Sequence, residues 1–193
     1  FNGIISKRHP NSSNSIIVNW TRVGELLKIY SQGNPIPFKT ISVKLLEDIK
    51  MFLLRALMGG NKKGTISQNT ASTYFSILKA GLKQAFVDEY LTVDISAKVK
   101  GITNIETPRV ALTMNEVQML VDTPCKDDVL KRAFLFSILT GLRHSDIQAL
   151  KWKQIQQTSK GTWQAVVVQQ KTKRPDYKPV IQQALQLCGE RPN

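Results

Sequence analysis

The stretch that decides the interpretation of this chain is Thr140-Gly141-Leu142-Arg143-His144-Ser145-Asp146-Ile147-Gln148-Ala149-Leu150-Lys151-Trp152. A glycine turn places Arg143 at the start of an amphipathic helix, where unpaired backbone amides favour an anion. Its guanidinium is a rigid fork of donors that matches two phosphate oxygens. The alternative is a surface arginine that pairs with Asp146 at i, i+3 spacing, which contributes little. Taken alone, Arg143 fits either interpretation.

The charge of the chain points to a polyanionic partner. The 193 residues carry 27 Lys and Arg against 14 Asp and Glu, which gives a net charge of +13. Residues 1–106 hold 14 basic and 7 acidic side chains, and residues 107–193 hold 13 and 7. Both halves therefore carry enough positive charge to contact a phosphate backbone, and nucleic acid is the partner that such a surface favours. A solvated basic surface without a partner is the alternative.

Several classes of protein are excluded by composition. A hydrophobic fraction of 41% is typical of a globular protein, and no apolar run approaches the roughly 18 residues that span a bilayer. The sequence begins at Phe1, so we expect upstream sequence to have been removed, and no signal peptide is visible. Two cysteines and two histidines make neither a disulfide framework nor a zinc site. We therefore expect a cytoplasmic protein, associated with the nucleoid, with no cofactor, no metal and no membrane partner.

Apolar periodicity predicts a helical bundle in the first part of the chain. The predicted helices are Ile16–Tyr30, Val43–Met58, and a third from an N-cap at Ser67 to Glu89 or Tyr90. Gly59–Gly64 is expected to be a flexible basic loop. Gly101–Ala111 is typical of a linker, with Pro108 in its middle. The predicted division is a helical domain at 1–104, a linker at 105–112 and a second domain at 113–193.

The second domain is predicted to begin with helices and continue with strands. A capping box, Thr113 to Glu116, starts one helix, and Asp127–Leu139 forms the next. The side chains expected to face the core are Val117, Leu120, Val121, Leu130, Phe134, Leu135 and Ile138. Residues 162–169 and 177–181 are expected to pair as a hairpin around a basic turn, before a last helix at 182–187.

The stretch around Arg143 resembles the first catalytic-arginine motif of the tyrosine recombinases, or phage-type integrases. Thr140 to Arg143, an acid at position 146, Leu150 and Trp152 match it in order and spacing. The resemblance is strongest to integrases of mobile elements from the Bacteroides group. It implies a mainly α fold with a small β-hairpin: an N-terminal SAM-like core-binding domain followed by the first part of a catalytic domain. It also implies that Arg143 is catalytic and that Asp146 is a supporting residue.

The same resemblance places a catalytic lysine in the hairpin turn. Lys171 is the preferred candidate for a general acid that protonates a departing 5′ oxygen, and Lys173 is the alternative. A basic turn that only grips backbone phosphates is a further possibility. His144 is interpreted as non-catalytic, because the catalytic histidines of the family belong to a later His-x-x-Arg motif that this sequence does not contain.

The family's nucleophilic tyrosine has no counterpart here. Tyr30, Tyr74 and Tyr90 fall in the predicted bundle, and Tyr177 follows Lys171 too closely. We therefore expect this chain to be a recombinase fragment that binds duplex DNA weakly and cuts nothing.

The resemblance implies double-stranded DNA as partner and a possible homo-tetramer on DNA for the full-length protein. The candidate DNA-binding residues are Lys62, Lys63, Lys79, Lys83, Lys173 and Arg174. A solvated helix face or loop is the alternative for the four in the bundle. The predicted function is site-specific recombination through a 3′-phosphotyrosyl intermediate. The alternatives are a non-enzymatic DNA-binding relative that regulates excision or transcription, and an unrelated basic protein that binds RNA.

Overall fold

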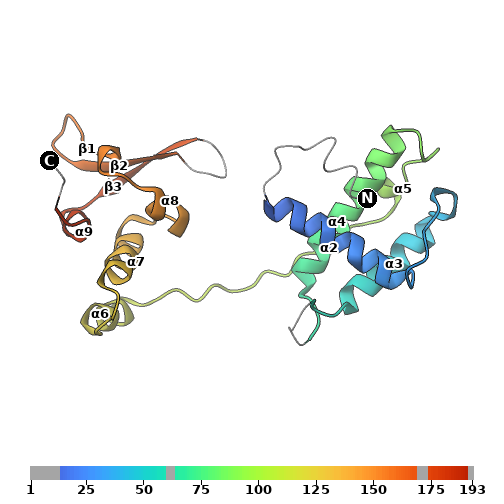
Figure 1. Cartoon of the computed structure of the whole chain (residues 1–193), viewed down its shortest axis with the longest axis horizontal. Coiled ribbons are helices and arrows are strands. Elements are labelled where there is room, and N and C mark those ends of the chain that lie inside the picture. The colour runs from blue at the N-terminus through green and yellow to red at the C-terminus, as the bar shows by residue number, and fades with distance from the viewer. Residues whose placement is uncertain (1–13, 60–63, 169–173, 191–193) are drawn as a thin grey trace. The chain divides into compact units, whose positions relative to one another are not determined.

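The computed structural model describes residues 14–59, 64–168 and 174–190, and the chain forms two units, Phe1–Pro108 and Arg109–Asn193 (Figure 1). Eight α-helices and three strands lie within the described residues. The predicted mainly α fold is therefore confirmed. None of the helices in this described part has the length and apolar character to span a membrane.

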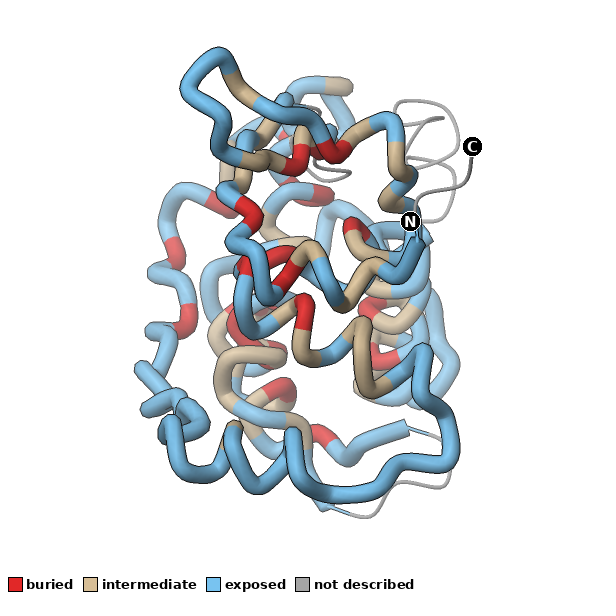
Figure 2. The backbone as a smooth tube through the Cα atoms, turned by 90° about the vertical axis from the view of Figure 1, so that its left-hand side faces the viewer, coloured by how far each residue is buried: buried red, intermediate tan, exposed pale blue. Residues whose placement is uncertain are grey.

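The N-terminal unit is a helical bundle. Its helices are α2 (Asn14–Tyr30), α3 (Val43–Arg55), α4 (Gln68–Val87) and α5 (Ile95–Lys98), with a 3₁₀ turn at Phe38–Thr40. Each long helix contributes an apolar stripe to one core. Figure 2 colours the buried residues of the chain red. Phe75 of α4 is fully buried in this core, which it shares with Leu26 of α2 and Leu46 of α3.

The ends of these helices follow from local chemistry. The Ser67 hydroxyl accepts the Thr70 amide at 3.2 Å, which confirms the predicted N-cap of α4. The prediction that α3 extends to Met58 was wrong, because the helix ends at Arg55. The Met58 amide instead donates to the Gly64 carbonyl at 2.8 Å, in an antiparallel bridge between Leu57 and Thr65. The pairing of Leu57 with Thr65 thus ends the helix at a point where the apolar spacing alone predicts that it continues.

The C-terminal unit joins helices to a small sheet. Its helices are α6 (Met114–Asp122), α7 (Asp128–Thr140), α8 (His144–Ala149) and α9 (Gln182–Leu187). The strands β1 (Ile155–Gln157), β2 (Trp163–Val168) and β3 (Pro175–Val180) form an antiparallel sheet in that order. The predicted hairpin is β2 with β3, in a register that sets Val168 opposite Pro175. The strand β1, after a 3₁₀ turn at Trp152–Gln154, was not predicted.

The expected core residues of α6 and α7 were partly wrong. Phe136 is 4% exposed and joins Leu142, Ala165, Val167, Val180 and Ala184 in the core, whereas α6 buries no side chain. Leu120, Val121, Leu130, Phe134 and Ile138 are exposed, and Val117 and Leu135 are half-buried. Leu130, Phe134 and Ile138 recur every four residues on the side of α7 opposite Phe136. The helix is therefore apolar on two faces, and within the described residues only one of them is covered.

Candidate functional site

The turn between α7 and α8 fixes the position of Arg143. Gly141 ends α7 in the left-handed region, with φ 66° and ψ 15°, and its amide donates to the Ser137 carbonyl at 2.8 Å. Leu142 then inserts into the core at 4% exposure, and its carbonyl accepts the Ser137 hydroxyl at 2.9 Å. Arg143 is the next residue, at the N-cap of α8, and it is exposed. The glycine turn and the buried leucine therefore set the arginine at the surface.

Arg143 and Asp146 differ in their exposure to solvent. The Arg143 carbonyl accepts the Asp146 amide at 2.9 Å, but no ion pair joins the two side chains, both of which are described. Asp146 is only 5% exposed, beside Ile147 and Leu150, which pack against the core. The i, i+3 surface pair considered as an alternative is therefore not formed. The guanidinium carries its charge at the surface, where an anion can reach it.

The proposed general acid cannot be placed. Lys171 and Lys173 lie outside the described residues, as do Lys62 and Lys63. The flanking strands are described: β2 ends at Val168 and β3 begins at Pro175. Arg174 precedes β3 and is exposed. Two residues on, Asp176 lies 3.4 Å from the Lys178 ammonium.

The two described lysines of the N-terminal unit differ in their surroundings. The Lys79 ammonium donates to the Val99 carbonyl at 2.6 Å and is partly buried, so one of its donors already has a structural partner. Lys83 is exposed. The pKa of the nearby Asp94 carboxyl lies below its usual value, chiefly because the Ser96 hydroxyl donates to it, with a smaller contribution from the charge of Lys83. Lys83 is thus the freer of the two to contact an external phosphate.

A cavity of about 310 Å³ that sequence reasoning did not find lies beneath α7. Its lining is Val129, Arg132, Ala133, Phe136, Ile147, Leu150, Lys151, Trp152, Ile155, Leu187 and Cys188. Arg132 is held by Asp128, whose carboxylate lies 2.8 Å from Nε. Burial raises the pKa of the Cys188 thiol, although the Arg132 charge opposes that shift. Arg143 is not part of this lining, and no sequence signal marks a cavity shared by so many elements.

Metal-ligating side chains do not gather anywhere in the described part of the chain: no group of three or more His, Cys, Asp or Glu is placed to hold an ion. Of the candidate site residues, Arg143, Asp146 and Arg174 are described in the C-terminal unit, and Lys79 and Lys83 are described in the N-terminal unit.

Comparison with known proteins gives the family. The sequence model of the phage integrase SAM-like domain matches residues 1–100, more than half of the chain. The chain belongs to this family. Its resemblance to the phage-type integrases is thereby confirmed. No curated protein sequence matches the chain.

Solved structures of lambda integrase share the fold. The chain resembles a fragment dimer bound to a COC′ core site, with a TM-score of 0.69 and 18% identity over 93% of this chain and 57% of that one. A tetramer bound to a Holliday junction gives 0.65 and 19% identity, over 93% and 48%. A fragment bound to DNA gives 0.63 and 19%, over 93% and 56%. The chain spans about half the length of these relatives.

Proposed function

We propose that the full-length protein is a site-specific DNA recombinase that breaks and rejoins DNA through a 3′-phosphotyrosyl intermediate. The observation that carries the proposal is the placement of Arg143: exposed, at the start of α8, and not neutralised by Asp146. It occurs in a chain whose first 100 residues match the phage integrase SAM-like domain. An arginine fork at a helix start is suited to a phosphate on which negative charge develops.

The chemistry assigns a distinct role to each residue. A tyrosine hydroxyl of the longer protein attacks the scissile phosphodiester, which joins tyrosine to the 3′ phosphate and releases a 5′ oxygen. Arg143 stabilises the negative charge on the phosphoryl oxygens, and Lys171 donates the proton that the 5′ oxygen takes up. A 5′ hydroxyl later reverses the step, and the covalent intermediate conserves the bond energy. Asp146, which is buried three residues after Arg143, orients the active-site arginines.

Duplex DNA is the proposed partner of both units. The lambda integrase structures were determined on a core site and on a Holliday junction, as a dimer and as a tetramer. The positive charge is shared almost equally between the two halves of this chain, which supports a backbone contact by each. Lys83 and Arg174 are the described candidates for these contacts, with Lys62, Lys63, Lys79 and Lys173 proposed beside them. We further propose assembly as a homo-tetramer on DNA, in the nucleoid.

The experiment that tests catalysis uses the full-length protein and a nicked suicide substrate that traps the covalent adduct. We expect Arg143→Ala and Arg143→Lys to lower the rate of adduct formation by about 10²–10³-fold, since lysine keeps the charge but loses the two-donor fork. Arg143→Lys should retain DNA affinity within about twofold. Full adduct formation by both variants would refute the role of Arg143.

The second candidate function is a non-enzymatic DNA-binding relative that regulates excision or transcription. The positive charge shared by both halves of the chain supports DNA binding by this candidate as well. The two functions differ in one measurement. The 193-residue chain should retard a labelled duplex in both cases, whereas only the recombinase gives a full-length protein that forms a phosphotyrosyl product.

A further inference from the structure

The side chains at the start of α4 bind the backbone of a segment 30–36 residues further along the chain. The Gln68 amide donates to the Thr103 carbonyl at 2.7 Å, and the Ser72 hydroxyl donates to the Ile102 carbonyl at 2.7 Å. Asn69 makes two bonds to a single residue: Nδ2 donates to the Ile105 carbonyl at 2.8 Å, and Oδ1 accepts the Ile105 amide at 2.8 Å. We call residues 99–105 the docked segment.

Apolar contacts support the same docking. Val99 and Ile102 are 2% and 9% exposed and belong to the core of the N-terminal unit. Ser72 is itself 8% exposed, so its hydroxyl and the carbonyl that it binds are paired away from water. A segment without secondary structure must find partners for its backbone groups, and α4 supplies them here as a neighbouring strand would. The docked segment is therefore part of the folded unit, although its sequence is typical of a linker.

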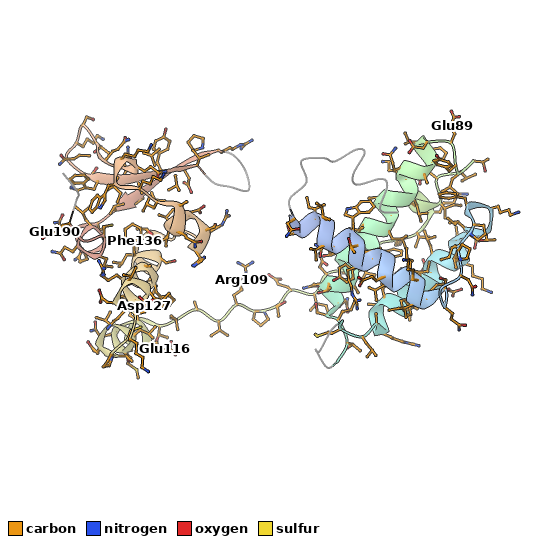
Figure 3. All side chains as sticks on the ribbon, in the orientation of Figure 1. Glu89, Arg109, Glu116, Asp127, Phe136 and Glu190 are labelled. Atoms are coloured by element: carbon orange, nitrogen blue, oxygen red, sulfur yellow. The ribbon has the colours of Figure 1, made fainter. Side chains whose placement is uncertain are left out.

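The chain is free of such bonds just beyond Ile105. Residues 106–112 form no hydrogen bond with any described residue, and the capping box of α6 begins at Thr113. Arg109 lies on this extended segment (Figure 3). At about 3.3–3.6 Å per residue, a seven-residue segment spans roughly 25 Å when fully extended. Release of residues 103–105 would lengthen it to roughly 35 Å.

We infer that Asn69 is a positioning residue: its paired bonds to Ile105 fix the point at which the linker leaves the N-terminal unit. The separation available to the two units is thereby limited to the span of residues 106–112. This limit affects DNA binding only when both units bind one duplex, and in that respect the inference rests on the proposed function. A shorter free linker then raises the effective concentration of the second unit at its site.

The test compares a double variant, Gln68→Ala with Asn69→Ala, with the matched control Asn115→Ala. Asn69 and Asn115 are each the second residue of a helix after a serine or threonine N-cap, and Asn115 is exposed with no hydrogen bond to a described side chain. Alanine is the best helix former, so α4 and α6 should both stay folded.

Distances between the units are measured by pulsed electron spin resonance on the whole chain. One spin label is placed on Cys125, which is exposed, and one on Val87→Cys, whose native side chain is 61% exposed on α4, with Cys188→Ser to leave two sites. We expect the double variant to extend the longest distances by about 10 Å, since three residues are released. The control should match the parent chain. An unchanged distribution in the double variant would overturn the inference.

A second measurement separates positioning from a loss of structure. Hydrogen exchange at the Ile105 amide should accelerate by about tenfold or more in the double variant, while the α4 amides keep their protection. Loss of protection throughout α4 would instead show that these side chains only hold the bundle together, which also overturns the inference.

Binding to a labelled duplex links the inference to function. The double variant should bind about twofold more weakly, because effective concentration falls roughly as the −3/2 power of linker length. The slope of affinity against salt should not change, since the number of phosphate contacts is the same. If the parent chain does not bind DNA, the proposed function fails, whereas the distances still decide the role of Asn69. Equal affinity despite longer distances would overturn the link to DNA.

Discussion

Replacing Gly141 tests whether the left-handed turn after α7 determines the position of Arg143. A Cβ built at Gly141 would meet no atom within 4 Å, so substitution introduces no clash. The entire native-state cost then comes from φ 66°, a conformation that costs an ordinary L-residue about 1–2 kcal/mol. Alanine recovers about 0.4–1 kcal/mol by restricting the unfolded chain. We therefore expect Gly141→Ala to destabilise the C-terminal unit by about 1 kcal/mol.

Thermal unfolding of the whole chain measures this change. Trp152 and Trp163 belong to the C-terminal unit and Trp20 belongs to the N-terminal unit, so tryptophan fluorescence follows both transitions, and a Trp20→Phe background isolates the C-terminal one. In a unit of roughly 60–100 residues, 1 kcal/mol lowers Tm by about 4–8 °C. Gly141→Asn should cost less than half as much, since asparagine adopts the left-handed region more readily.

Gly101→Ala is the matched control, because its Cβ also meets nothing within 4 Å and its φ lies outside the left-handed region. It should leave the N-terminal transition unchanged or slightly raised. If Gly141→Ala is as harmless as Gly101→Ala, the argument that backbone conformation at this turn sets the presentation of Arg143 is refuted.

Three further predictions concern core packing, thiol reactivity and pH. Phe136→Ala should lower the free energy of unfolding in urea by about 3–5 kcal/mol, because it removes a buried side chain of α7. Phe134→Gln, on the exposed face of the helix, should change it by no more than about 0.5 kcal/mol. Equal losses would contradict the burial of the Phe136 face. Iodoacetamide should alkylate the exposed Cys125 faster than Cys188 at pH 8, since burial raises the pKa of the Cys188 thiol, and mass spectrometry of the two peptides would expose the reverse order. The pKa of the Glu116 carboxyl is lowered because the Thr113 amide and hydroxyl both donate to it. Its stabilisation of α6 is therefore complete above the ordinary glutamate pKa and is lost as the pH falls through the lowered pKa of the folded chain. Circular dichroism should record a loss of helix over that pH range, and the Glu116→Gln variant should lack this loss.

Local chemistry made parts of the fold predictable. The Ser67 N-cap, the Thr113–Glu116 capping box and the stop at Gly141 each depend on residues within four positions of one another, and the structure has all three. The pairing of β2 with β3 was predicted as a hairpin, because β2 is rich in β-branched residues and a returning strand was expected at 177–181. Elements whose hydrogen bonds are satisfied nearby are therefore the ones that sequence reasoning recovered.

Longer-range features escaped because nothing near them in the sequence marks them. The helix α3 ends early because of a bridge between Leu57 and Thr65, and helix propensity carries no information about such a pairing. The apolar spacing of α7 predicted burial of Leu130 and Phe134, but it cannot say which of two apolar faces the rest of the unit covers. The docking of Ile105 on Asn69 joins residues 36 positions apart, in a stretch whose composition predicts only a linker.

The environments of Arg143 and Asp146 agree with the roles proposed for the two residues. A carboxylate that leaves water needs partners, because an unpaired buried charge is costly. Asp146 is 5% exposed and makes no ion pair with a described residue, while the arginine three residues earlier is exposed to solvent. The Arg143 guanidinium therefore stays available to a phosphate, which is what the proposed function requires of it.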